Sequence, residues 1–303
     1  MRAVAASVVF LLFLFFGVPP AEADDLRTPS PAAKATCDCA SFESALTEAR
    51  ARFASRQEGV AMPLTPVMHN HYRACVDAAF GRADCLATCP DVPEPARNRA
   101  RVLLAEAGFK DASIGAAELR ARLTVVLAAM TRCLEIEPEH RACQLWHASS
   151  RGFLARGSWN PLNIRLPSQL MSEFRSARGG APPGRDHVDG AATRGEASML
   201  LRVPRYAGGD VTAGRQLIEE ARSAPMFGCR LANRIVLAEA LGKTGDLPAA
   251  RTELKAIVDA GLPACGTERY ENAMSLEEAA RCLARLDAAP DSDPGWDENC
   301  RRP

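Results

Sequence analysis

His69 and His71, together with Cys75, could ligate a metal ion, because imidazole nitrogens and thiolates are common metal ligands. Further possible ligands are two close cysteine pairs, Cys37-x-Cys39 and Cys85-x3-Cys89. The chain has no C-x-x-C pair, no C-x-x-C-H haem motif and no H-E-x-x-H helix, which are the strong signatures of metal and haem sites. The sequence therefore predicts no metal and no cofactor, and it leaves the role of His69 and His71 open.

The five histidines could also act as general bases beside a serine, cysteine or carboxylate. No serine or cysteine lies in a nucleophile motif such as G-x-S-x-G. We expect His140, which follows Pro138, to begin a helix and face solvent, and His147 to pack between helices. Trp146 and Trp159 are expected in the core. The sequence therefore predicts a protein without catalytic residues.

Disulfides are the expected fate of the eleven cysteines if the chain is exported, and the odd number leaves at least one unpaired. Nine residues that include a proline turn separate Cys133 from Cys143. The two should lie at equal distances from a corner between antiparallel helices, within the ~4.4–6.8 Å Cα separation that a disulfide needs. The same spacing, across an expected helix break at Phe80-Gly81-Arg82, predicts a second pair, Cys75–Cys85. A third candidate pair, at the open end of a helix pair, is Cys229–Cys265.

Residues 1–23 have the pattern of a signal peptide. An apolar run from Ala3 to Phe16 is followed by Ala21-Glu22-Ala23, an A-x-A cleavage pattern. The run is shorter than the roughly 20 residues of a spanning helix, which argues against the alternative of an uncleaved membrane anchor. No cysteine lies directly after the cleavage site, since the first is Cys37, so the lipid-attachment pattern is missing. We expect a periplasmic or secreted protein.

The composition indicates an all-α protein. The chain is 47% hydrophobic but only 6% aromatic, and it is rich in the strong helix formers Ala, Leu, Arg and Glu. Its 37 basic and 37 acidic residues balance, which argues against a nucleic-acid partner. Amphipathic helical patterns are expected near residues 40–56, 69–80, 95–107, 115–136, 140–156, 189–203, 211–224, 229–243, 248–260 and 275–288.

An internal repeat explains a glycine-rich segment that could otherwise cradle phosphate. The stretch GDVTAGRQLIEEARSA, residues 209–224, aligns with GDLPAARTELKAIVDA, residues 245–260, at an offset of 36 residues with five identities in sixteen positions. In both copies a glycine can make the turn, and Asp210 or Asp246 can cap the helix that follows. The residues of a Walker loop or a dinucleotide loop are missing. We therefore interpret the segment as a corner between helices.

A period near 34 residues, small residues where helices meet and a proline after the second helix resemble the tetratricopeptide repeat. The best copy is residues 234–263, and residues 133–148 look like a junction between two repeats. Residues 186–260, with a proline, a Gly-Gly-Asp corner and a last helix pair, further resemble the T component (TatT) of the repeat-associated tripartite ATP-independent periplasmic transporters. That resemblance implies a non-catalytic periplasmic scaffold that partners a solute-binding protein.

The expected organisation is a signal peptide at 1–23, a flexible leader at 24–36, a helical repeat domain at 37–290 and a C-terminal tail at 291–303. Within the repeat domain, residues 37–110 match the repeat weakly and residues 186–263 match it best. The expected fold is a tetratricopeptide-like α-solenoid of antiparallel helix pairs. Its concave surface would bind a protein partner or an apolar ligand. The alternatives are an exported enzyme of unknown reaction and a disulfide-hardened spacer.

Export is the first testable expectation. Cleavage after Ala23 should give an exported protein that begins at Asp24, because the A-x-A pattern ends there. Intact mass spectrometry of the protein from the exported fraction measures this directly. A mass that includes Met1 would contradict the assignment.

Overall fold

The computed structural model describes residues 39–109, 116–155, 165–265, 268–289 and 296, and within them the secondary structure is helical, without a strand. This confirms the expected all-α class. The expected signal peptide and leader lie outside the described residues, as does all of the tail except Trp296. The described α-helices are α1 (Phe42–Ser55), α2 (Pro66–Ala87), α3 (Glu94–Phe109), α4 (Ala116–Ile136), α5 (Arg141–Ala155), α6 (Leu166–Arg178), α7 (His187–Arg202), α8 (Val211–Ala221), α9 (Leu231–Lys243), α10 (Leu247–Ala260) and α11 (Arg269–Ala288).

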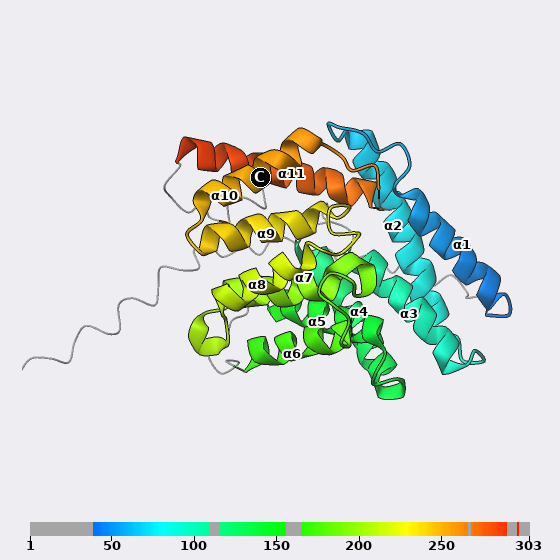
Figure 1. The fold of residues 1–303 in the computed structure, drawn as a ribbon. Helices are drawn as coiled ribbons and strands as arrows, with labels where there is room; N and C mark the ends of the chain where they lie inside the picture. The colour runs from blue at the N-terminus through cyan, green and yellow to red at the C-terminus, as the bar shows by residue number, and fades with distance from the viewer. Residues whose placement is uncertain (1–38, 110–115, 156–164, 266–267, 290–295, 297–303) are drawn as a thin grey trace, which may run out of the picture. The chain divides into compact units, whose positions relative to one another are not determined.

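Each helix packs against the next one along the chain (Figure 1). Where the connections are short, packed neighbours run antiparallel. The odd-numbered helices also contact one another in order, from α1 through α3, α5, α7 and α9 to α11. None of the described helices combines the length and the hydropathy that a membrane crossing requires.

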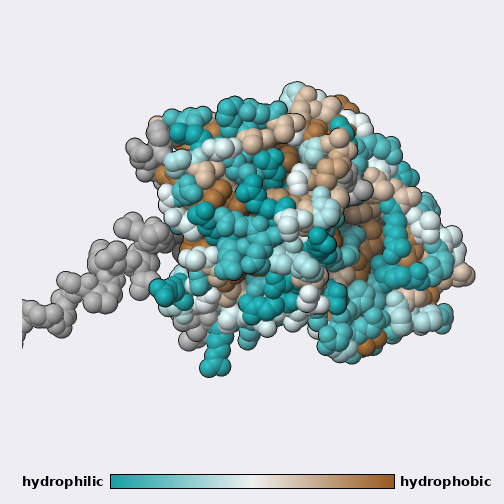
Figure 2. Space-filling model, in the orientation of Figure 1, coloured by the Kyte–Doolittle hydropathy of each residue, from teal (hydrophilic) through white to brown (hydrophobic). Residues whose placement is uncertain are grey.

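A hydrophobic core joins α7 to α11 in the second half of the chain. Leu237, Leu254 and Ile257 are fully buried in it, and burying such a side chain stabilises the fold by about 1.5–3 kcal/mol. Trp296 also belongs to this core and packs on Gly242, where a Cβ atom would lie 2.5 Å from the indole ring. The face seen in Figure 2 is mostly hydrophilic, and its hydrophobic residues lie largely in recesses between helices.

The glycine-rich segment before α8 folds as a tight corner. A short 3₁₀ helix, η2 (Arg205–Ala207), ends at Gly208 with a φ of 99°. At Gly209 a Cβ atom would lie 1.7 Å from the carbonyl oxygen of Val203, so no other residue fits without a shift of the backbone. Asp210 and Asp246 are the N-cap residues of α8 and α10, and their carboxylates accept from the backbone N–H groups of Ala213 and Ala249.

Two helices differ from the sequence prediction. The stretch that contains α6 was not predicted to be helical, although Leu170, Met171, Phe174 and Ala177 form a buried stripe at helical spacing. The expected break at Phe80-Gly81-Arg82 is wrong, because α2 continues through Gly81 to Ala87.

Two of the three predicted disulfides are present. Cys133 and Cys143 are bonded at a Cα separation of 6.2 Å, and Cys229 and Cys265 at 5.3 Å. A disulfide that the sequence analysis did not pair joins Cys39 to Cys89. Disulfides form and persist in oxidising compartments, so these three indicate an extracytoplasmic environment.

The predicted pair Cys75–Cys85 is wrong. Cys75 is a buried free thiol, and Cys85 is disulfide-bonded to another residue. The physical reason is the unbroken helix α2, which contains both cysteines. Ten residues of α-helix span about 15 Å, far more than a disulfide can bridge.

A charged cluster links α7, α9 and α11 beside the core. Arg202 of α7 donates to Glu239 of α9 at 2.8 Å, and the Glu239 side chain is buried. Glu278 of α11 lies in the same cluster, where burial raises its pKa to about 7. The Glu239 carboxylate adds to the rise, while Arg202 and Arg281 oppose it.

The Glu278 pKa predicts a pH-dependent stability. The raised pKa means that the folded protein holds this proton more tightly than the unfolded chain does, so the free energy of unfolding should fall as pH rises from about 4.5 to about 7. Glu278→Gln removes the titration, and its stability relative to wild type should increase by about 1–3 kcal/mol between pH 5 and pH 8. Urea denaturation at both pH values measures the difference. A constant difference across this range would contradict the prediction.

Candidate functional site

A cavity of about 620 Å³ lies where the odd-numbered helices meet. Each of the six odd-numbered helices contributes to the lining, either with its own residues or with residues directly next to its ends. The lining residues are Phe53, Ala54, Arg56, Gln57, Glu106, Trp146, His187, Val188, Asp189, Arg230, Glu268 and Arg269. The volume lies in the range of small-molecule sites, about 300–1,000 Å³. We take this cavity as the candidate functional site and call it the central cavity.

Buried polar contacts between the two ends of the helix array close one side of the central cavity. Arg56, directly after α1, lies 3.2 Å from Glu268 and 3.2 Å from Glu271 of α11. Gln57 donates to Glu271 at 2.6 Å and accepts from the backbone N–H of Tyr270 at 2.6 Å. These contacts hold the first helix against the last.

Aromatic packing between α2 and α11 supports the same closure. The rings of Tyr72 and Tyr270 stack with centroids 3.7 Å apart, and both side chains are buried. The Tyr72 hydroxyl donates to Glu271 at 3.0 Å. Burial, followed by the Glu271 carboxylate, raises the pKa of Tyr72 well above its usual value, so the hydroxyl remains a donor at any physiological pH.

The ion network continues from Glu268 across the cavity to α7. The second carboxylate oxygen of Glu268 pairs with Arg230, whose Nε lies 3.2 Å from a carboxylate oxygen of Asp189. Asn233 of α9 donates to the Asp189 carbonyl at 3.1 Å and accepts from Arg194 at 2.6 Å. Burial and the adjacent Arg230 guanidinium lower the pKa of Arg194 to about 10.

The other side of the cavity is apolar and aromatic. Trp146 of α5 stacks on Phe109 with centroids 5.1 Å apart, and the Arg56 guanidinium lies 3.7 Å from the centre of the Phe53 ring. The indole N–H of Trp146 is buried and has no hydrogen-bond partner among the described residues. A buried donor of this kind costs about 1–3 kcal/mol until an acceptor meets it.

A left-handed turn carries Val188 and Asp189 into the lining. Val188, Asp189 and Gly190 have φ values of 55°, 51° and 86°, so two non-glycine residues occupy the left-handed region. Asp186 holds the turn, because its carboxylate accepts from Ala192 N at 2.9 Å and from Thr193. Such strain, of order 1–3 kcal/mol per residue, is concentrated at functional sites in proteins.

The structure does not bring the candidate histidines together at one site. His69 is hydrogen-bonded to the Tyr270 hydroxyl, and His71 Nε2 lies 2.9 Å from the carbonyl oxygen of Ser55. His147 pairs with Glu173 of α6 at 2.9 Å, which agrees with packing between helices. His187, 3.7 Å from Glu106, is the one histidine in the lining of the central cavity. Trp159 lies outside the described residues.

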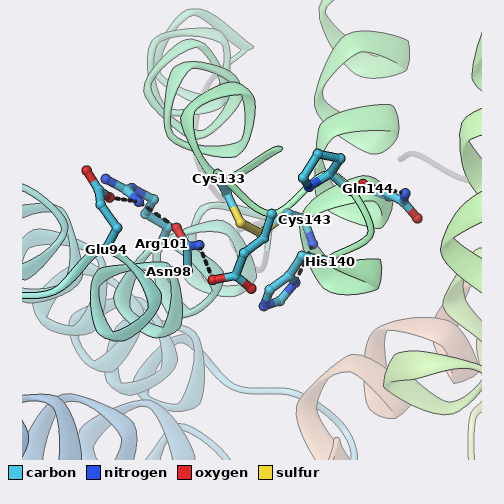
Figure 3. Close-up of a disulfide and its surroundings, with 9 residues drawn as sticks. Glu94, Asn98, Arg101, Cys133, His140, Cys143 and Gln144 are labelled. Carbon is cyan, nitrogen blue, oxygen red and sulfur yellow. Dashed lines mark hydrogen bonds and ion pairs between the residues drawn. A yellow bond between two sulfur atoms is a disulfide. The ribbon is translucent and has the colours of Figure 1, made fainter. Parts of the chain in front are cut away.

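One group of side chains among the described residues has metal-ligating atoms within 4.8 Å of one another: Cys133, His140 and Cys143. Figure 3 shows that the two sulfur atoms are bonded to each other and that His140 lies beside them. Sulfurs in a disulfide are not thiolates and so are not metal ligands. Nδ1 of His140 accepts from the backbone N–H of Cys143 at 3.4 Å, which gives this histidine a structural role at the start of α5.

The residues that build the central cavity were not singled out from the sequence. Arg56 and Glu268 are 212 positions apart, and the lining mixes helix ends that share no motif. The carboxylates of Asp189 and Glu268 are both engaged in ion pairs.

Comparison with protein-family models gave no match, and comparison with curated proteins gave none either.

The left-handed turn predicts an unusual order of stability at position 188. In the left-handed region glycine is favoured over other residues by about 1–2 kcal/mol, so Val188→Gly should be more stable than Val188→Ala by about 1 kcal/mol. Val125, half-exposed in α4, is the matched control, because in a helix alanine is favoured over glycine by about 1 kcal/mol. Denaturant unfolding of the four variants gives both differences. If the alanine variant were the more stable one at position 188 as well as at position 125, the proposed backbone strain at Val188 would be wrong.

Proposed function

We propose that this protein is an exported, non-catalytic scaffold of the tetratricopeptide-repeat type, which binds a segment of a partner protein in the central cavity. The observation that carries the proposal is the lining, to which all six odd-numbered helices contribute and in which most charged groups are already paired within the chain. A site whose charges are compensated selects an occupant by shape and by apolar contact.

The helix order supports a repeat arrangement. Successive odd-numbered helices contact one another as well as their sequence neighbours, as expected when helix pairs stack side by side. The two segments of the internal repeat form α8 and α10, each preceded by a glycine with positive φ or a close backbone contact and by a capping aspartate. We infer a solenoid whose ends approach each other, so that its inner surface becomes a cavity.

The lining favours a peptide segment with an aromatic or aliphatic side chain as the occupant. Phe53, Ala54, Trp146 and Val188 supply apolar surface. Exposed Arg269 and the Glu106–His187 pair add polar groups to the lining. Following the resemblance to TatT, the proposed partner is an exported protein such as the solute-binding protein of a tripartite transporter.

Site-specific photocrosslinking tests this proposal. A photoreactive phenylalanine analogue at Ala54, an exposed residue of the lining, should crosslink one dominant exported protein in the native host. The matched control is Ala51, which is exposed on the same helix but outside the lining, and it should give little or none of that product. In the Ala54 background, Trp146→Phe removes part of the aromatic surface of the lining, and it should weaken the crosslink several-fold.

Equal crosslinking from both positions would contradict binding in the cavity. Absence of a crosslinked protein, together with an apolar molecule recovered by solvent extraction of the purified protein, would favour the apolar-ligand alternative. Absence of both would favour a spacer. Turnover of a substrate that Trp146→Phe abolishes would favour the enzyme alternative.

A further inference from the structure

A second cavity, of about 550 Å³, lies where α5 begins, α6 ends and the turn before α7 starts. His187 belongs to its lining and to that of the central cavity. Three arginines and two histidines line it against only two carboxylates. We call it the basic cavity. The proposed function does not use it.

Two of the three guanidinium groups have no charged partner in the described chain. Arg178 lies 3.4 Å from Glu196. Arg141 and Arg185 are exposed, and neither forms an ion pair with any described residue. The carboxylate of Asp186 already accepts from Ala192 and Thr193, as described above, so its oxygens are committed.

The Arg141 side chain lies against the end of α6. Gly179, the C-cap of α6, has a φ of 58°, and a Cβ atom there would lie 2.2 Å from Nε of Arg141. The guanidinium therefore packs on the backbone at Gly179, in space that a larger residue there would share. Arg141 is also the first residue of α5, where the helix dipole adds favourable potential for an anion.

We propose that the basic cavity binds a small oxyanion through Arg141 and Arg185. Guanidinium groups present paired N–H donors that match the oxygens of phosphate or carboxylate groups. Arg178 contributes positive charge from the end of α6. With Glu139 and Asp186 counted against the three arginines, the lining has one more basic than acidic group when both histidines are neutral. This site is independent of the partner segment proposed for the central cavity.

Isothermal titration calorimetry with inorganic phosphate tests the site, with chloride adjusted to keep ionic strength constant. We expect saturable binding with a stoichiometry of one, and a loss of at least tenfold in affinity for Arg141→Gln and for Arg185→Gln. Arg141→Lys keeps the charge but loses the paired donors, so its affinity should lie between wild type and Arg141→Gln. A parallel titration with succinate distinguishes a phosphate site from a carboxylate site.

The matched control is the double variant Arg50→Gln/Arg52→Gln, which removes two exposed arginines of α1 far from the lining and has the same net charge as Arg141→Gln/Arg185→Gln. It should bind the anion as wild type does. Equal losses in the two double variants would overturn the proposal, because they would show attraction by net charge alone. No saturable binding of either anion to wild type would also overturn it. Circular dichroism of each variant verifies that the fold is retained, as expected for exposed arginines.

Discussion

The carboxylate of Glu268 is the group on which the arrangement of the helices depends, because it binds Arg56 with one oxygen and Arg230 with the other. All three side chains are at least nine-tenths buried. Burying charges is costly, and the cost is offset only while every charge keeps its partner. Loss of the carboxylate would leave two buried guanidinium groups with one carboxylate partner each, Glu271 for Arg56 and Asp189 for Arg230. The contact between α1 and α11, and with it the wall of the central cavity, therefore depends on Glu268 together with Glu271, which also binds Arg56 and accepts from Gln57.

The described disulfides connect residues that are close in the sequence, unlike the contacts between α1 and α11. They join residues 10, 36 and 50 positions apart, so they connect neighbouring helices or the ends of a single helical hairpin. The contacts that close the array join residues about 200 positions apart: Arg56 with Glu268, and Tyr72 with Glu271. The array could thus open between α1 and α11 while these three disulfides stay intact. Among the described residues, the contacts that hold α1 and α2 against α11 are ion pairs, hydrogen bonds and aromatic packing.

Features that depend on short stretches of sequence could be predicted. Helical spacing and the capping aspartates located α8 and α10, and the proline turn located the Cys133–Cys143 disulfide. Gly81 was misread because a glycine costs a helix only about 1 kcal/mol, and the fully buried side chains of Val76, Ala79, Ala83 and Leu86 on α2 outweigh that cost. The cavity could not be predicted, because a pairing of Arg56 with Glu268 leaves no periodic signal and depends on how every intervening helix packs.

The left-handed turn at the start of α7 connects the two cavities. Asp186 and His187 line the basic cavity, while His187, Val188 and Asp189 line the central cavity. The turn persists because three separate contacts hold it: Asp186 bonds to the helix that follows, Arg230 binds the Asp189 carboxylate, and Asn233 binds the Asp189 carbonyl. Since Arg230 also binds Glu268, the network that closes the array is the same one that keeps the turn in its strained conformation. Both cavities therefore depend on the closed arrangement of the helices.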